Sequence, residues 1–190
     1  MKVVHQIEIQ RKGGVCSVYP SSCIVRDLIA RAGLFKPFET LSVLDLTFGQ
    51  GLFYYSFRNK AKVFGFDVQR LDWVVKPYRF YKASCDKWGK MLPDGITFDL
   101  VVVDPPFSPY RRGWGKRHHY RDNCSISRCM YEAMKASEKF KTPILIHFFW
   151  KTIPYNYETI VETWFQGWSR LTKLPRPTWF GIVSKEVVSE

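Results

Sequence analysis

Short apolar runs recur along the middle of the chain, and each is bounded by polar residues or glycine. Their β-branched and aromatic content is typical of strands buried in a sheet. The predicted strands of this kind are Leu41–Leu46, Lys62–Phe66, Arg79–Ala83, Asp99–Val103 and Pro143–Phe149. Because helical patterns separate them, we predict a largely parallel, doubly wound α/β sheet with right-handed crossovers.

Helical spacing of apolar residues appears between and after these runs. The segment Cys23–Ala32 follows a serine cap at Ser21 or Ser22 and is ended by Gly33. The remaining predicted helices are 52–59, a weakly marked stretch at 71–76, 126–140 and 157–165.

Both ends of the chain are predicted to add strands. Val3–Gln10 alternates apolar and polar side chains and predicts a strand, with Val15–Tyr19 as its hairpin partner. Near the carboxyl end, 170–174 and 178–184 predict an antiparallel pair. The expected sheet has about seven strands, mostly parallel and flanked by helices. An amino-terminal strand and hairpin extension occupies residues 1–18.

The composition fits a single folded domain over residues 1–190. A hydrophobic content of 46%, with 17% aromatic residues, excludes a disordered chain. The formal net charge of +12 predicts a positive surface that attracts polyanions, and nucleic acid is the partner we expect. The alternative is a generally basic, solvated surface without such a partner. The longest apolar stretch, near Pro143–Trp150, is too short to span a bilayer, so we expect no membrane partner.

The cysteines and histidines predict no metal site. The five cysteines form no C-x-x-C pair and no zinc-like spacing, and Cys124 and Cys129 are expected to pack within the fold. His118 and His119 adjoin each other without acidic or thiol companions. The odd cysteine count and the lack of a signal-peptide pattern predict a reduced, cytoplasmic protein.

A glycine-containing turn, Asp45–Gly51, joins a predicted strand to a predicted helix. Gly49 and Gly51 let the backbone turn sharply and approach a ligand closely, although a tight strand–helix turn needs glycine in any case. Asp67 ends the next predicted strand, where a carboxylate can accept both hydroxyls of a ribose. Because Tyr54 stands where a dinucleotide fingerprint has its third glycine, the pattern favours a compact nucleoside cofactor.

The buried run Leu100–Val103 ends in Asp104-Pro105-Pro106-Phe107. The two prolines cannot donate to a sheet, and they fix the backbone into a stiff corner. This corner carries a carboxylate, rigid carbonyls and an aromatic face at the carboxyl edge of the predicted sheet, where open α/β folds bind ligands. Taken alone, the tetrapeptide also fits a rigid surface turn. Its place after a buried strand, downstream of the glycine turn, favours an active site.

These two segments resemble motifs of the S-adenosylmethionine-dependent amino-methyltransferases: the D-x-x-x-G-x-G cofactor loop and the catalytic (D/N/S)-P-P-(Y/F/W) tetrapeptide. The resemblance covers roughly residues 19–150 and implies a Rossmann-like methyltransferase fold with S-adenosylmethionine as the cofactor. The loop departs from many members, which carry Pro-Phe where this chain has Leu46-Thr47. The residues that the resemblance and the loop assign to cofactor binding are Tyr19, Ser21, Asp45, Thr47, Phe48, Gly49, Gly51, Asp67 and Asp86.

The same resemblance assigns catalysis to Asp104, Pro105, Pro106 and Phe107. It implies that the Asp104 side chain and the Pro105 carbonyl accept hydrogens of an exocyclic amine while Phe107 stacks on the base. The implied activity is methyl transfer to a nucleic-acid base, with adenine N6 in DNA or RNA expected first and guanine N2 in RNA as an alternative. Two other classes stay open: a non-catalytic nucleic-acid-binding module with this fold, and a chain that works with a partner subunit or as a homodimer.

Residues 108–123 are dense in basic and aromatic side chains. Cations can neutralise phosphates while rings stack on exposed bases, and Gly113 and Gly115 suit a lid. The alternative is a solvated basic loop. The residues that we assign to substrate binding are Tyr110, Arg111, Arg112, Trp114, Lys116 and Arg117. The tryptophans expected to pack in the core are Trp150, Trp164, Trp168 and Trp179.

Overall fold

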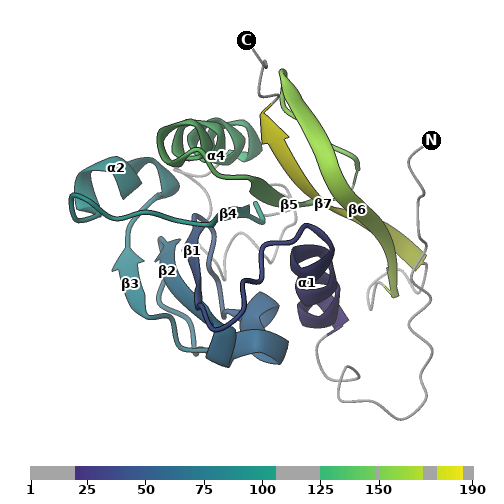
Figure 1. Cartoon of the computed structure of the whole chain (residues 1–190), viewed down its shortest axis with the longest axis horizontal. Helices are drawn as coiled ribbons and strands as arrows, with labels where there is room; N and C mark the ends of the chain where they lie inside the picture. The colour runs from purple at the N-terminus through teal and green to yellow at the C-terminus, as the bar shows by residue number, and fades with distance from the viewer. Residues whose placement is uncertain (1–19, 106–124, 149, 169–174, 186–190) are drawn as a thin grey trace, which may run out of the picture.

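The computed structural model describes residues 20–105, 125–148, 150–168 and 175–185 (Figure 1). Several predictions concern residues outside these ranges and stay predictions: the amino-terminal strand and hairpin, Tyr19, Pro106, Phe107, the loop 108–123 and the strand 170–174.

The described strands form one seven-stranded sheet in the order β3-β2-β1-β4-β5-β7-β6. Strands β1 to β5 pair in parallel, whereas β7 is antiparallel to both of its neighbours, β5 and β6. The bounds are β1 Leu41–Asp45, β2 Ala61–Asp67, β3 Arg79–Lys82, β4 Leu100–Val103, β5 Ile144–Phe148, β6 Tyr157–Trp168 and β7 Pro175–Lys185. The sheet confirms the predicted α/β class, mostly parallel and doubly wound with an antiparallel pair at the carboxyl end.

Helical elements cover both faces of this sheet. Their bounds are α1 Pro20–Arg31, η2 Leu52–Lys60, η3 Cys85–Lys87, α2 Trp88–Met91 and α4 Ile126–Phe140. In Figure 1, α2 and α4 lie on one side of the central strands and α1 lies on the other. Among the described helices, none combines the length and the apolar character needed to cross a membrane.

Successive side chains of a strand point to opposite faces, so the central strands supply two apolar cores. On one face Val43 and Val102 pack in a cluster with Leu28 of α1. On the other face Val101 packs in a cluster with Ala133 of α4. All four of the residues Val43, Val102, Val101 and Ala133 are fully buried. Burial of each valine side chain contributes about 1.5–3 kcal/mol, so the central strands form a rigid support for the residues that follow them.

Helix α4 matches its predicted bounds of 126–140 because both of its ends carry local stop signals. The Ser125 hydroxyl caps the start by accepting from the Arg128 N–H at 3.1 Å. At the other end Lys141 adopts a left-handed conformation, φ 52°, and its N–H donates to the Ser137 carbonyl.

The predicted helix at 157–165 is wrong, because this segment belongs to strand β6. Buried and more exposed side chains alternate there: Tyr157, Val161 and Thr163 are buried, whereas Glu158 and Ile160 are exposed. The β-branched content suits a strand, and pairing with β7 along the whole length decides the conformation.

Two further helical predictions need correction. The stretch 71–76 forms no helix, and the N–H groups of Val74 and Val75 instead donate to the Gln50 carbonyl beside the glycine turn. The segment after that turn is helical as predicted, but η2 is a 3-10 helix interrupted at Phe57, which has φ −141° and ψ 26°. Short 3-10 pieces of this kind are common where a chain must turn quickly back into a sheet.

Candidate active site

Polar side chains gather where neighbouring strands end at one edge of the sheet. Asp45 ends β1, Asp67 ends β2 and Asp104 directly follows β4. His147 lies near the end of β5. The carboxyl ends of parallel strands meet at the same edge, and the register places Asp45 opposite Gly65 of β2 and Val102 of β4. The structure therefore brings together three predicted acids and one histidine that the sequence analysis did not include.

Asp104 is held by two hydrogen bonds, one to the glycine turn after β1 and one to β5. Its backbone N–H donates to the Thr47 hydroxyl at 2.7 Å, and its Oδ1 lies 2.9 Å from Nδ1 of His147. The Asp104 side chain keeps 30% of its surface exposed, although β4 before it and Pro105 after it are buried. The carboxylate is thus fixed in place and still accessible from solvent.

Thr47 connects the glycine turn to the Asp104 corner. Its N–H donates to Asp45 Oδ1 at 2.9 Å, while its hydroxyl accepts from the Asp104 N–H. Thr47 stands at the position where many of the resembled enzymes carry phenylalanine, and a phenyl ring cannot accept this bond. The departure in the loop therefore creates a direct bond between the two predicted motifs.

Both glycines of the turn have left-handed backbones, with φ 57° at Gly49 and 74° at Gly51. A Cβ at Gly51 would lie 2.5 Å from the Val75 carbonyl oxygen, so the protein itself fills that space. A Cβ at Gly49 would have as its nearest neighbour the Thr47 carbonyl oxygen, at 3.9 Å. The turn is therefore closed beneath Gly51 and open at Gly49, as a site for a closely approaching ligand requires.

Phe48, expected at the cofactor, has its ring in the core. It is only 4% exposed and stacks with Tyr54 at a centroid distance of 6.0 Å. The ring also covers Gly65 of β2, where a Cβ would come within 2.5 Å of it. The open side of the turn is thus formed by backbone rather than by this ring.

Asp45 is a buried carboxyl group beneath the turn, with 2% of its surface exposed. The Tyr54 hydroxyl donates to its Oδ2 at 2.7 Å. Burial disfavours the charged form and raises the pKa of Asp45 to about 7, outweighing the hydrogen bonds that favour the carboxylate. This residue supports the turn from inside the fold.

The raised pKa of Asp45 predicts a pH-dependent stability that Asp45→Asn removes. The folded protein holds a proton that the unfolded chain, with an ordinary value of 3.8, releases first. Stability contributed by Asp45 is therefore present at low pH and lost as the pH rises from about 4 to 7, by roughly 4 kcal/mol. Urea unfolding across this range measures it as the difference between the native chain and the Asn variant, whose amide does not titrate. Parallel profiles for the two proteins would contradict the assignment.

Asp67, which is predicted to bind a ribose, is the last residue of β2. It is 6% exposed, and its two oxygens accept from the N–H groups of Gly49 at 3.0 Å and Gln69 at 2.9 Å. These bonds orient the carboxylate against the turn.

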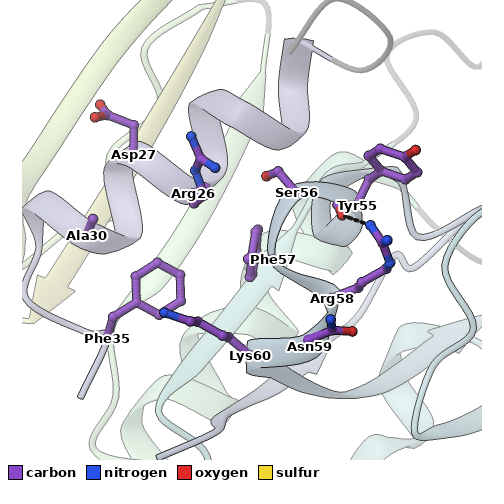
Figure 2. A pocket seen from close by; sticks show the side chains of 10 residues that line it. All are labelled: Arg26, Asp27, Ala30, Phe35, Tyr55, Ser56, Phe57, Arg58, Asn59 and Lys60. Atoms are coloured by element: carbon purple, nitrogen blue, oxygen red, sulfur yellow. Dashed lines mark hydrogen bonds between the residues drawn. The ribbon is translucent and has the colours of Figure 1, made fainter. Parts of the chain in front are cut away.

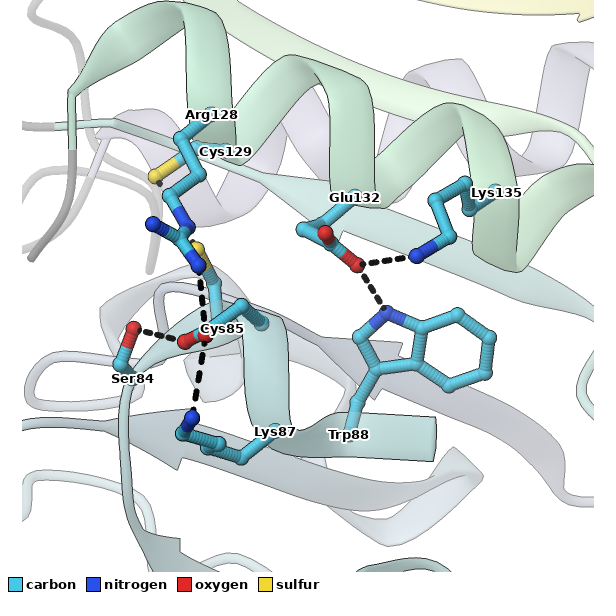
Figure 3. Close-up of polar contacts among 9 residues, drawn as sticks. Ser84, Cys85, Lys87, Trp88, Arg128, Cys129, Glu132 and Lys135 are labelled. Carbon is cyan, nitrogen blue, oxygen red and sulfur yellow. Dashed lines mark hydrogen bonds and ion pairs between the residues drawn. The ribbon is translucent and has the colours of Figure 1, made fainter. Parts of the chain in front are cut away.

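Asp86, expected to meet an adenine amino group, is already paired with cations. Its Oδ2 lies 2.6 Å from Nη2 of Arg128 and 3.3 Å from Nζ of Lys87, and the Ser84 hydroxyl donates to its Oδ1. Figure 3 shows these three partners gathering from η3, its preceding residue and α4. The hydrogen bond from Ser84 is the main cause of a lowered pKa at Asp86, and the nearby cations act in the same direction. Arg128 was not predicted as a partner of Asp86.

The same close-up contains two contacts that join α4 to the η3–α2 segment (Figure 3). The indole N–H of Trp88 donates to Glu132 at 2.9 Å, and the sulfurs of Cys85 and Cys129 lie 3.7 Å apart. Cys129 is buried, as expected, and Cys124 lies outside the described residues.

Ser21 lies in the first turn of α1 and is partly buried. Its neighbour Ser22 is fully buried and fastens α1 to η2: its hydroxyl donates to Ser56 Oγ at 2.8 Å and accepts from the Ser56 N–H at 2.7 Å. This positions the start of α1 relative to the segment that follows the glycine turn.

A cavity of about 620 Å³ lies between α1 and η2 (Figure 2). Arg26, Arg58 and Lys60 contribute positive charge to its walls, and Phe35 and Phe57 contribute rings. Of the predicted site residues that the structure describes, none lines it. It is a separate feature from the strand-end cluster.

The tryptophans divide between core and surface. Trp179 is fully buried and Trp164 packs partly buried against the core, as expected. Trp150 is 58% exposed, so its assignment to the core is wrong. It lies two residues beyond the end of β5, outside the strand. The side chain of Trp168 lies outside the described residues.

No protein-family model matches this chain. No curated protein matches it in sequence.

Solved structures do resemble it. A putative RNA methyltransferase from Pyrococcus horikoshii has a TM-score of 0.57 at 14% identity, covering 90% of this chain and 84% of its own. A magnesium protoporphyrin IX methyltransferase from Synechocystis, solved with bound S-adenosylmethionine, has a TM-score of 0.51 at 13% identity, covering 88% and 78%. An rRNA methylase from Streptococcus thermophilus has a TM-score of 0.50 at 11% identity, covering 84% and 94%. The chain therefore has the Rossmann-like methyltransferase fold that its motifs predicted.

Proposed function

We propose that this protein transfers a methyl group from S-adenosylmethionine to an exocyclic amine of a nucleic-acid base, with adenine N6 as the first candidate. One observation supports the proposal above all others: Asp104, whose carboxylate is partly exposed, is bonded through its backbone N–H to Thr47 of the glycine turn. An acceptor corner and a ligand-binding turn thus lie side by side at the edge where open α/β sheets bind ligands.

The turn has the features that a nucleoside cofactor needs. Its backbone is open at Gly49, and the carboxylate of Asp67 lies beside it at the end of β2, the position where such folds bind a ribose. Ser21 and Asp86 are further candidates for cofactor contact, although Asp86 would have to share its carboxylate with Arg128. S-adenosylmethionine would supply a methyl group that its sulfonium already activates.

The corner suits the chemistry of an aromatic amine. The lone pair of such an amine is delocalised into the base, so the nitrogen is a poor nucleophile until its hydrogens are held by acceptors. Asp104 supplies a carboxylate oxygen, and Pro105 supplies a carbonyl on a rigid backbone. The nitrogen would form a bond to the methyl carbon as the carbon–sulfur bond breaks, S-adenosylhomocysteine would leave, and the proton lost by the nitrogen would pass to solvent. Alignment by the corner would supply much of the acceleration.

A nucleic acid is the substrate that the charge favours. The net charge of +12 and the basic, aromatic sequence of residues 108–123 suit phosphates and exposed bases. Two of the structurally similar proteins are named as an rRNA methylase and a putative RNA methyltransferase, which makes RNA the first substrate to test. Specificity would come from RNA shape and from local contacts.

Incubation of the purified protein with tritiated S-adenosylmethionine and mixed DNA and RNA, followed by nucleoside mass spectrometry, tests the proposal. Label in N6-methyladenosine or its deoxy form supports the first candidate, and label in N2-methylguanosine supports the alternative. A chain that binds the cofactor but labels nothing points to a required partner subunit. Binding of nucleic acid without binding of the cofactor supports the alternative of a non-catalytic nucleic-acid-binding module.

Replacing Arg111, Arg112, Lys116 and Arg117 together by alanine is expected to weaken nucleic-acid binding and to flatten its dependence on salt. Each cation that neutralises a phosphate releases counterions, so its loss reduces the slope of log affinity against log salt by about one. Binding isotherms at several salt concentrations provide the measurement. An unchanged slope would remove residues 108–123 from the substrate site, and Lys36→Ala, an exposed cation paired with Glu39, is the matched control.

A further inference from the structure

His147 is placed beside Asp104 by the register of two parallel strands. Val103 of β4 pairs with Ile146 of β5, so the next residue on each strand is Asp104 and His147. Both side chains lie on the α1 and η2 face of the sheet, because Val102 and Leu145, two residues earlier, belong to the core on that face. The 2.9 Å contact between Asp104 Oδ1 and His147 Nδ1 therefore follows from the backbone arrangement.

Two aromatic side chains fix the plane of the imidazole. Phe180 of β7 stacks on it with a centroid distance of 3.9 Å and an interplanar angle of 16°. Phe53 of η2 meets it edge-on at 5.7 Å and 71°. With 9% of its surface exposed, His147 has little room to rotate, and Nδ1 stays directed at the carboxylate.

The protonation state of this contact can be assigned from simple chemistry. An ionised carboxylate has no hydrogen to donate, so the imidazole supplies it and Nδ1 carries the proton. Oδ1 of Asp104 is then occupied by the bond from His147. Oδ2 accepts no hydrogen bond from the described residues, so it is the oxygen that we assign to a substrate amine.

We propose that His147 is the positioning residue of Asp104: its Nδ1–H holds Oδ1 so that Oδ2 faces the amine to be methylated. The proposal rests on the proposed function and adds a residue to that site. Thr47 fixes the backbone of Asp104 and His147 fixes its side chain, so the two bonds together leave the carboxylate one orientation. A histidine that only filled space in the core would need no hydrogen bond to a partly exposed carboxylate.

Two variants separate the hydrogen bond from the packing of the ring. His147→Phe keeps an aromatic ring against Phe180 and Phe53 but removes the donor. His147→Asn loses the ring but places its Nδ2–H close to where Nδ1–H was. We expect kcat to fall about 100-fold in H147F and to be restored to within about tenfold in H147N, with KM for S-adenosylmethionine unchanged in both. Equal losses in the two variants, or no loss in H147F, would overturn the proposal.

Nitrogen-15 NMR of the histidines at pH 8 tests the bond without any substrate. H147N identifies the His147 signals by their loss. We expect the Nδ1–H tautomer in the native chain and the ordinary Nε2–H tautomer in Asp104→Ala. An Nε2–H tautomer in the native chain would overturn the proposal, whatever the activity. If the native chain shows the Nδ1–H tautomer and methylates nothing, the hydrogen bond between His147 and Asp104 is supported. The role of His147 in methyl transfer is then rejected together with the proposed function.

Discussion

Asp104→Ala is expected to reduce methyl transfer by about 1,000-fold while the affinity for S-adenosylmethionine stays within about threefold. The carboxylate is the acceptor through which an amine is oriented and made more nucleophilic. It contacts the glycine turn only through its backbone N–H, which the alanine variant keeps. Single-turnover rates with saturating cofactor, together with calorimetry of cofactor binding, separate the two effects.

Asp104→Asn is the matched control for this experiment. Its amide oxygen can still accept one hydrogen bond, and asparagine occurs at this position in the motif that the tetrapeptide resembles. We expect an intermediate rate. A rate for D104A close to that of the native chain, with the same methylated product, would exclude Asp104 from catalysis.

Gly51→Ala and Gly49→Val are expected to fail in different ways, although only one residue separates the two glycines. Alanine at position 51 would place Cβ 2.5 Å from the Val75 carbonyl oxygen and 2.7 Å from Cζ of Phe48. It also keeps a left-handed φ of 74°. Strain and overpacking together should lower the free energy of unfolding by about 3 kcal/mol. Urea unfolding measures this loss.

Valine at position 49 meets open space on the protein side, so only the cost of a left-handed φ of 57°, about 1–2 kcal/mol, is expected for stability. Its side chain would occupy the volume into which a cofactor must approach the backbone. G49V should therefore stay folded and show no binding heat with S-adenosylmethionine. Full cofactor affinity in folded G49V would move the cofactor away from the turn.

Much of the sheet was predictable because its signals are local. A few adjacent residues are enough to predict three of these features: the buried run before Asp104, the glycine turn after β1 and the caps of α4. Strand β6 was not predictable in this way. Its apolar and polar residues fit helical spacing as well. Its conformation is decided by pairing with β7, the next strand along the chain, which the pattern within 157–165 does not reveal.

The residues of the candidate site likewise divide into those that the local sequence predicts and those that depend on the arrangement of the fold. Asp45, Asp67 and Asp104 could be named because each stands at the end of a recognisable strand. His147 and Arg128 could not, because their partners come from other elements and depend on which strands and helices are neighbours. One signal was present: once β4 and β5 are taken as neighbours, His147 lies one step beyond the run that pairs with Val101–Val103.

The position of the Phe48 ring could not be predicted from the loop sequence. An aromatic residue in a cofactor loop suggests contact with the ligand, yet its ring fills the space above Gly65 in the core. The direction of a side chain in a tight turn depends on backbone angles that composition does not reveal. Thr47 replaces the phenylalanine that many of the resembled enzymes carry in this loop, and its hydroxyl accepts the hydrogen bond from the Asp104 N–H.

A crystal structure of the protein with S-adenosylhomocysteine tests the central claim most directly. We expect the ribose hydroxyls at Asp67, the backbone at Gly49 against the ligand, and the ligand sulfur facing Oδ2 of Asp104 across a gap that one amine nitrogen can fill. A ligand bound elsewhere, or a sulfur turned away from that carboxylate, would contradict the account.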